Sequence, residues 1–313
     1  MPHSGSITVI TPERSQRGLA YAIAAYALWG AVPAYFLLLA PAGATEIVAW
    51  RIMFSLVFCA ILLTVTRGWP AFLAILRQPR LVLITGLAGA LIYINWQVFV
   101  LAALNGQILE SALGYFINPI LTVLLGVVFL KERLRPAQWV AVSISAVAIV
   151  VMSVGLGVFP WISLSLALSF GLYGLIKKQA GPRIDAITGL TLETMWLVPV
   201  ASVILIVVAS TSGIVFGTVS GMHTTLLALA GVVTALPLLL FAAAARRLTL
   251  VTIGMVQYLT PVLSFLFAVL IMKESMPVER WIGFGLVWVA LIILSADMIR
   301  QADLRRRGRR TRP

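Results

Sequence analysis

Hydrophobic residues follow one another in this chain in long, nearly uncharged runs, not in the one-faced or alternating patterns of a water-soluble fold. A run of about 20 such residues is long enough to cross the hydrocarbon core of a bilayer as a helix. Ten runs of this kind occupy residues 18–38, 46–66, 81–103, 109–130, 137–154, 160–176, 186–208, 223–244, 250–272 and 279–299. The polar segments between them are mostly short, which leaves no room for a soluble domain. The pattern predicts an all-α polytopic membrane protein with ten transmembrane helices.

Composition agrees with this interpretation. Of the 313 residues, 61% are hydrophobic and 11% are charged, whereas about a quarter of the residues of a soluble domain are charged. Residues 1–17 are polar, and the first apolar run is longer than that of a signal peptide, so we expect it to be retained as the first helix. The single cysteine, Cys59, excludes an intramolecular disulfide.

Basic residues are distributed unevenly between the two sides that ten spans would create. With the N-terminus in the cytoplasm, 20 of the 23 lysines and arginines fall on inner segments, while Lys273 and Arg280 fall on outer loops and Arg51 falls within a span. This positive-inside bias predicts a multi-pass protein of the cytoplasmic membrane with both termini in the cytoplasm. We interpret the arginine-rich tail as a solvated segment near anionic lipid headgroups and expect no nucleic-acid partner.

The chain contains an internal repeat. Residues 88–139 align without a gap to residues 230–281, and 12 of these 52 positions are identical. The pairs Pro119 with Pro261 and Trp139 with Trp281 belong to this match, and "AYALWG" (25–30) similarly corresponds to "SFGLYG" (169–174). Each half therefore holds five spans.

An odd number of spans per half predicts that the second half enters the membrane upside down. Loop charges agree, because the basic segment 131–135 corresponds to the nearly neutral segment 273–277. Inverted repeats are typical of secondary transporters, whose halves rock around a central site. We divide the chain into a cytoplasmic segment (1–17), a first five-helix repeat (18–154), an inverted second repeat (160–299) and a basic cytoplasmic tail (300–313).

Several motifs resemble those of a known family. They are "YALWGAVPAYF" (26–36), "EIVAWRIMFS" (46–55), "ESALGYFINP" (110–119), "FLKERLRPAQW" (129–139), "FGLYGLIKK" (170–178) and "LETMWLVPV" (192–200). They resemble the RarD proteins of the EamA group in the drug/metabolite transporter superfamily, over residues 18 to 299. The resemblance implies ten helices in two halves, an inner-membrane location, and export or exchange of a small organic solute such as an amino acid or a chloramphenicol-like compound.

Polar residues form matching stripes on the fourth and ninth spans. At helical spacing one face of each span carries Ser111, Tyr115, Asn118 and Thr122, and Ile253, Gln257, Thr260 and Ser264. Polar groups avoid lipid, so both stripes are expected to face an interior cavity that binds the substrate. The alternative is helix packing, in which such side chains contribute about 0.6 kcal/mol each.

Pro119 and Pro261 interrupt these same spans. Each lacks an amide hydrogen, and its ring displaces the carbonyl one turn earlier, at Tyr115 and Gln257 respectively. Freed carbonyls are tolerated in a membrane where they meet protein or line water. The alternative, a simple kink that shapes the bundle, is compatible with this.

Two acidic residues are candidates for proton coupling. Glu193 lies about 10 Å along its helix from the cytoplasmic end, and Glu46 lies near the opposite face on the corresponding span. A carboxyl group within the membrane can carry a proton, and the alternative for Glu46 is an interface residue. Arg51 either snorkels outward, pairs with a carboxylate or grips an anionic substrate.

Aromatic residues at mid-span form a second candidate substrate surface. Trp96 is expected to join Tyr26, Trp29, Phe170 and Tyr173 in an aromatic wall, with ordinary packing as the alternative.

Enzymatic motifs are missing from the sequence. It has no G-x-S-x-G elbow, P-loop or dinucleotide fingerprint, and its two histidines lie apart from other metal ligands. We therefore predict no enzyme, cofactor or metal. The predicted function is secondary active transport of a small organic solute by alternating access, most simply as export, with the proton as candidate coupling ion. A channel and a non-transporting membrane scaffold are the alternatives.

Overall fold

The computed structural model describes residues 12–104, 108–154 and 161–266, together with short stretches between residues 281 and 300. Within these residues the regular structure is helical throughout. The helices are α1 (Pro12–Leu37), α2 (Ala44–Val65), α3 (Trp69–Leu76), α4 (Pro79–Leu104), α5 (Ile108–Leu130), α6 (Pro136–Val154), α7 (Trp161–Ala180), α8 (Ala186–Thr211), α9 (Gly221–Ala245), α10 (Leu250–Gln257) and α11 (Leu259–Leu266).

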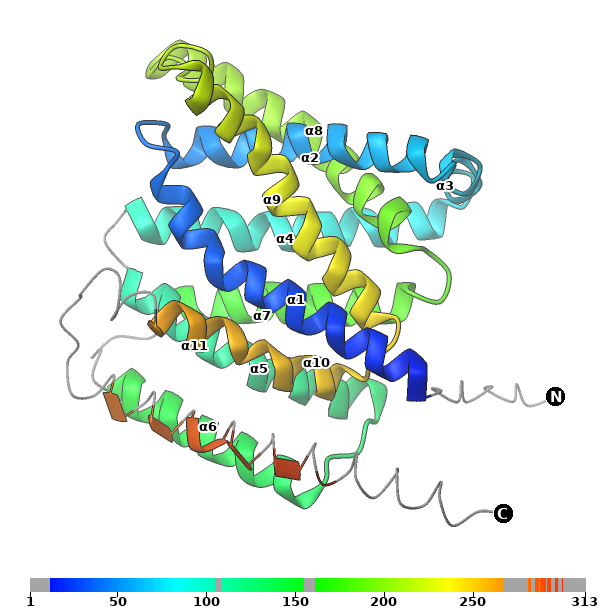
Figure 1. Ribbon diagram of the computed structural model, residues 1–313, viewed down its shortest axis with the longest axis vertical. Coiled ribbons are helices and arrows are strands. Elements are labelled where there is room, and N and C mark those ends of the chain that lie inside the picture. The colour runs from blue at the N-terminus through cyan, green and yellow to red at the C-terminus, as the bar shows by residue number, and fades with distance from the viewer. Residues whose placement is uncertain are drawn as a thin grey trace.

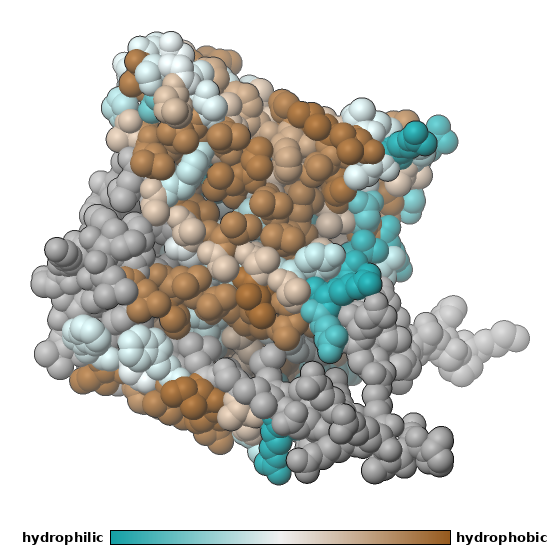
Figure 2. Space-filling view, in the orientation of Figure 1, coloured by the Kyte–Doolittle hydropathy of each residue, from teal (hydrophilic) through white to brown (hydrophobic). Residues whose placement is uncertain are grey.

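Five segments of the described helices have the length and composition to cross a membrane: Ser15–Phe36, Ala44–Val65, Pro79–Phe99, Ala186–Thr211 and Gly221–Ala245. Shorter apolar helices run over Gly114–Leu130, Pro136–Ala148 and Leu250–Leu263. Figure 2 shows the matching surface, with hydrophobic side chains across the middle and hydrophilic ones at the right-hand edge. The all-α membrane architecture is confirmed. The number of ten spans stays a prediction, because about half of the span expected at 279–299 lies outside the described residues.

The helices lie side by side and are stacked along the long axis of the molecule (Figure 1). Helix α2 packs against α8 and α9, α4 against α7 and α8, and α5 against α7 and α10. Helices from the two parts of the chain are therefore interleaved. In Figure 1, α2 runs from left to right and α8 from right to left, so these two neighbours point in opposite directions.

Helix starts recur at a fixed interval along the chain. Helices α2, α4 and α5 begin at residues 44, 79 and 108, and α8, α9 and α10 begin at residues 186, 221 and 250, each 142 residues later. Two close helix crossings recur at the same interval. A Cβ atom at Gly89 of α4 would lie 3.0 Å from the backbone oxygen of Glu193, and one at Gly231 of α9 would lie 2.3 Å from the backbone carbon of Phe54.

The structure adds detail to the predicted helices at the two prolines and at one short helix. The apolar run expected at 250–272 is divided at Tyr258 into α10 and α11, in keeping with the interruption predicted at Pro261, which cannot donate to Gln257 and whose ring displaces that carbonyl. Pro119, by contrast, lies inside a continuous α5. Helix α3 was not expected, because its eight residues are too few for a membrane span.

Candidate functional site

Glu193 forms a buried ion pair with a lysine of the neighbouring helix. The Lys177 Nζ atom lies 2.6 Å from Glu193 Oε1, and the Tyr173 hydroxyl donates a hydrogen bond to Oε2 over 3.1 Å. Only 2% of the glutamate and 7% of the lysine is exposed. A buried carboxylate needs such a partner, since an isolated charge in a medium of low dielectric is strongly destabilised.

Local sequence explains how the three side chains meet. Tyr173 and Lys177 are four residues apart on α7 and therefore share one face of that helix. Asp185 caps the start of α8, where its carboxylate accepts hydrogen bonds from the backbone amides of Ile187 and Thr188 at 3.0 Å. The cap fixes the beginning of α8 and so places Glu193 on its second turn, beside α7.

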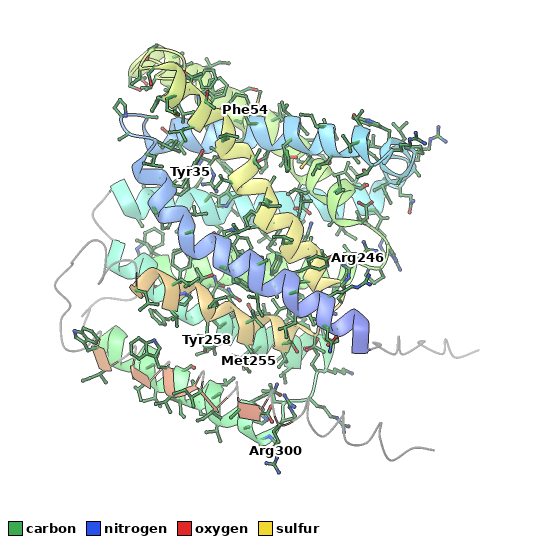
Figure 3. The ribbon with its side chains drawn as sticks, in the orientation of Figure 1. Tyr35, Phe54, Arg246, Met255, Tyr258 and Arg300 are labelled. Atoms are coloured by element: carbon green, nitrogen blue, oxygen red, sulfur yellow. The ribbon has the colours of Figure 1, made fainter. Side chains whose placement is uncertain are left out.

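A small pocket lies against this ion pair at one end of the bundle. Its lining comes from α4, α7, α8 and α9 and from the turn between α7 and α8, and includes Thr85, Lys177, Asp185, Glu193 and Arg246. Arg246 marks this end at the right of Figure 3, near the start of α1 and on the same side as Arg300. The pocket thus connects the buried pair with the end of the bundle that carries basic residues.

Sequence analysis identified Glu193 but missed its partner. The sequence predicts Lys177 to be one of the 20 basic residues on inner segments, because the apolar run expected at 160–176 stops one residue before it. In the structure α7 continues to Ala180, which places Lys177 inside the bundle. The signal was available, because a lysine one turn beyond an apolar run remains in phase with the preceding Tyr173.

Arg51 has a different environment on α2. Its guanidinium lies between two aromatic rings, 5.1 Å from the centre of Phe36 and 4.9 Å from the centre of Trp96. The Nε atom donates a 2.7 Å hydrogen bond to the Thr234 hydroxyl, which itself donates to the Ala230 carbonyl. Among the described residues, no carboxylate lies within ion-pair distance of Arg51. Of the three possibilities for Arg51, pairing with a carboxylate therefore finds no partner in the described part of the chain.

Glu46 accepts hydrogen bonds from the segment that joins α8 to α9. The backbone amides of Val215 and Phe216 both donate to it at 3.0 Å, and Trp50 Nε1 donates at 3.1 Å. With 1% exposure the side chain is fully enclosed. This geometry favours the interface alternative for Glu46, because its acceptor positions already hold the segment in place.

The two polar stripes meet at a direct contact between α5 and α10. Thr122 Oγ1 donates to Gln257 Oε1 over 3.2 Å, and both side chains are buried. Thr260 instead donates to the Tyr26 carbonyl over 2.8 Å. These bonds agree with the packing alternative at Thr122, Gln257 and Thr260. The buried amide oxygen of Asn118, by contrast, has no hydrogen-bond partner within the part of the chain that the structure describes. The side chains of Ser111 and Ser264 lie outside the described residues.

The expected aromatic wall forms around a residue that sequence analysis did not name. Tyr26, Trp29, Phe170 and Tyr173 all contact the ring of Phe241, at centroid distances of 5.4 to 6.3 Å. Phe241 comes from α9, far away in sequence. Trp96 packs at the edge of the same core, where it stacks on Arg51. The ring of Tyr115 contacts that of Phe99, with the ring centres 6.0 Å apart.

Comparisons with a protein family and with individual proteins give matches over nearly the whole chain. Residues 16–154 and 160–296 each match the model of the EamA-like transporter family. Protein RarD of Streptomyces exfoliatus is 44% identical over 93% of this chain and 92% of its own length. Protein RarD of Escherichia coli is 39% identical over 92% of this chain and 96% of its own length.

A solved structure has a similar fold. It is described only as the crystal structure of a protein, is 17% identical in sequence, and superposes with a TM-score of 0.64 over 90% of this chain and 98% of its own. At this identity the likeness concerns the fold alone.

Proposed function

The chain belongs to the EamA-like transporter family, within which it is a RarD relative, and we propose that it is a secondary active carrier that moves a small organic solute across the cytoplasmic membrane by alternating access. It is a multi-pass membrane transporter and not an enzyme. The proposal adds the mode of transport, the site and the coupling ion.

The first part of the proposal concerns architecture. We take residues 18–154 and 160–299 as two inverted five-helix repeats that rock around a central site. The recurrence of helix starts at an interval of 142 residues supports this division, as does the opposite direction of α2 and α8 in Figure 1. Both termini are assigned to the cytoplasm, since inner segments carry most of the basic residues.

The second part concerns the substrate surface. Substrate would bind between the halves, against the aromatic wall of Tyr26, Trp29 and Tyr173 and beside Trp96. The polar groups Tyr115, Asn118 and Thr122 of α5 and Gln257 and Thr260 of α10 and α11 are proposed to border the same interior, and Ser264, whose side chain lies outside the described residues, is proposed to join them from its place in the sequence. The hydrogen bond between Thr122 and Gln257 joins α5 to α10, so substrate binding is expected to break or re-form this bond during the transport cycle. Pro119 and Pro261 each remove one backbone hydrogen bond from these helices.

The third part concerns coupling, and the ion pair of Glu193 and Lys177 is the observation that carries it. A proton on Glu193 would remove the carboxylate charge that neutralises Lys177, and would thereby weaken the attraction between α7 and α8 beside the pocket. Release of the proton would restore the pair. The proposal gives Glu46 no coupling role, because the backbone amides of Val215 and Phe216 donate to its Oε1 atom and the amide of Val215 also donates to Oε2.

Counterflow in proteoliposomes tests the carrier assignment. The purified protein is reconstituted with unlabelled solute inside, and uptake of the same radiolabelled solute is measured across a panel of amino acids, metabolites and chloramphenicol. A carrier gives saturable uptake that internal solute stimulates. Single-channel current without such stimulation would instead establish a channel, and no flux of any panel solute would favour the scaffold.

A further inference from the structure

We propose that Arg51 recognises a carboxylate on the transported solute, so that the carrier selects small organic anions or zwitterions over neutral compounds. This inference rests on the proposed carrier function and adds the chemical class of the substrate. It starts from a half-buried guanidinium that the protein orients but does not neutralise within the described residues.

The orientation of Arg51 is fixed from three sides. Phe36 from α1 and Trp96 from α4 lie at the guanidinium, and Thr234 from α9 holds its Nε atom. Stacking and one hydrogen bond on Nε leave the terminal nitrogens, Nη1 and Nη2, without a hydrogen-bond partner among the described residues. These two atoms form the edge of the planar fork that binds a carboxylate through two parallel hydrogen bonds.

Charge around the site favours one carboxylate over a phosphate group. The four helices that bring these side chains together are α1, α2, α4 and α9, and Arg51 is the only basic residue between Gly18 and Val65. Helix α4 has a single lysine or arginine, Arg80 at its opposite end, and α9 has neither. One guanidinium balances a single negative charge, whereas a dianionic phosphate would remain partly uncompensated inside the membrane.

The position of Arg51 links it to the proposed substrate surface. Trp96, whose ring lies 4.9 Å from the guanidinium, adjoins the core that contains the aromatic wall. An anion bound at Arg51 would therefore place its organic part toward aromatic rings. If Arg51 only extended its charged end toward the membrane surface, the guanidinium would not need the hydrogen bond to Thr234 on α9. This bond therefore favours substrate binding over snorkelling.

Matched acid and amide probes test the inference. Benzoate with benzamide, phenylacetate with phenylacetamide, and L-phenylalanine with L-phenylalaninamide differ chiefly in the carboxylate. Binding to the purified full-length protein is measured by thermal stabilisation and by tryptophan fluorescence. We expect at least one acid to bind about tenfold or more tightly than its amide, the difference that a charge-assisted bidentate contact provides. Equal binding of acid and amide, or no binding of any acid, would overturn the inference.

Variants assign the effect to this side chain. Arg51→Gln is expected to abolish the preference for the acid, and Arg51→Lys to reduce acid binding about tenfold because lysine lacks the planar fork. Arg80→Gln removes an exposed arginine as a control and leaves the preference unchanged. If Arg51→Gln fails to fold, Arg51→Lys decides, and an acid-to-amide ratio equal to that of the wild type contradicts the proposal.

Counterflow separates this inference from the carrier assignment. If Arg51→Gln exchanges a solute as well as the wild type does, the protein is a carrier but Arg51 does not select its substrate. If the wild type shows no saturable exchange while acids still bind at Arg51, the carrier assignment fails and the binding site stands.

Discussion

Glu193 and Arg51 occupy equivalent places in the two parts of the chain, 142 residues apart on the matching helices α8 and α2. They carry opposite charges and lie toward opposite ends of the bundle, which Arg246 and Tyr35 mark in Figure 3. Glu193 has its countercharge within the protein, whereas Arg51 has aromatic rings and one hydroxyl. Equivalent positions in the two parts of the chain thus have different environments: the charge of Glu193 is neutralised within the protein, whereas the charge of Arg51 has no carboxylate partner among the described residues.

The largest expected loss of stability comes from leaving the buried Glu193 carboxylate without its countercharge. Lys177→Met leaves Glu193 without its countercharge, which is expected to destabilise the protein by about 3–5 kcal/mol. The double variant Lys177→Met/Glu193→Gln removes both charges and should recover most of this loss. Arg51→Met is expected to lose less than Lys177→Met, since no described carboxylate is stranded. Unfolding of the purified variants in detergent measures all three. A Lys177→Met protein as stable as the double variant would contradict the difference drawn between the two sites.

The two equivalent glycines allow a second comparison. Gly231→Ala places a Cβ atom 2.3 Å from the Phe54 backbone, so α9 must move away from α2 at an expected loss of about 1–3 kcal/mol. In Gly89→Ala the new Cβ atom would lie 3.0 Å from the Glu193 carbonyl oxygen, so this variant should lose less stability than Gly231→Ala. Thermal unfolding ranks the two variants, with Gly43→Ala, which meets nothing within 4 Å, as the control. The reverse ranking would show that the two crossings do not differ as described.

A smaller effect is expected at the anchor of Arg51. Thr234→Val keeps the volume and loses the hydrogen bond to Nε, which should reduce stability by about 1 kcal/mol and lower the acid-to-amide binding ratio. Thr225→Val, at an exposed hydroxyl of the same helix, serves as the control. An acid-to-amide ratio unchanged by Thr234→Val would mean that the anchor does not orient the guanidinium for binding.

The smallest effect is expected at the contact between the two polar stripes. Thr122→Val removes the bond to Gln257 and should destabilise the protein by about 0.6 kcal/mol. The same variant should alter the rate of counterflow, because the hydrogen bond that it removes joins α5 to α10. Stability within error of the wild type together with unchanged counterflow would reduce the contact to ordinary packing without a part in transport.

Much of the fold could be predicted because a membrane imposes a simple length rule. The run expected at 46–66 is α2 at Ala44–Val65, and the run at 186–208 begins α8 at its first residue. Such agreement follows because a backbone in lipid must satisfy its own hydrogen bonds as a helix. The length rule says nothing about helices that do not cross the membrane, so the eight-residue α3 was not predicted.

The candidate site was less predictable because the side chains that contact Glu193 and Arg51 come from other helices. Glu193 could be identified from sequence, since a carboxylate within an apolar run stands out. Its pairing with Lys177 depends on how far α7 extends beyond its apolar run. The stacking of Arg51 joins α1, α2 and α4, and no local pattern indicates which rings of those helices meet the guanidinium. Phe241 likewise enters the aromatic wall only through the packing of α9.

The most direct measurement compares proton-driven accumulation with counterflow in proteoliposomes of the Lys177→Met/Glu193→Gln variant. Because both charges are removed together, the protein stays folded while the proposed proton carrier is gone. We predict that counterflow persists and that accumulation against a solute gradient, driven by an imposed proton gradient, is lost. If the double variant accumulates solute as the wild type does, the buried pair does not couple transport to protons.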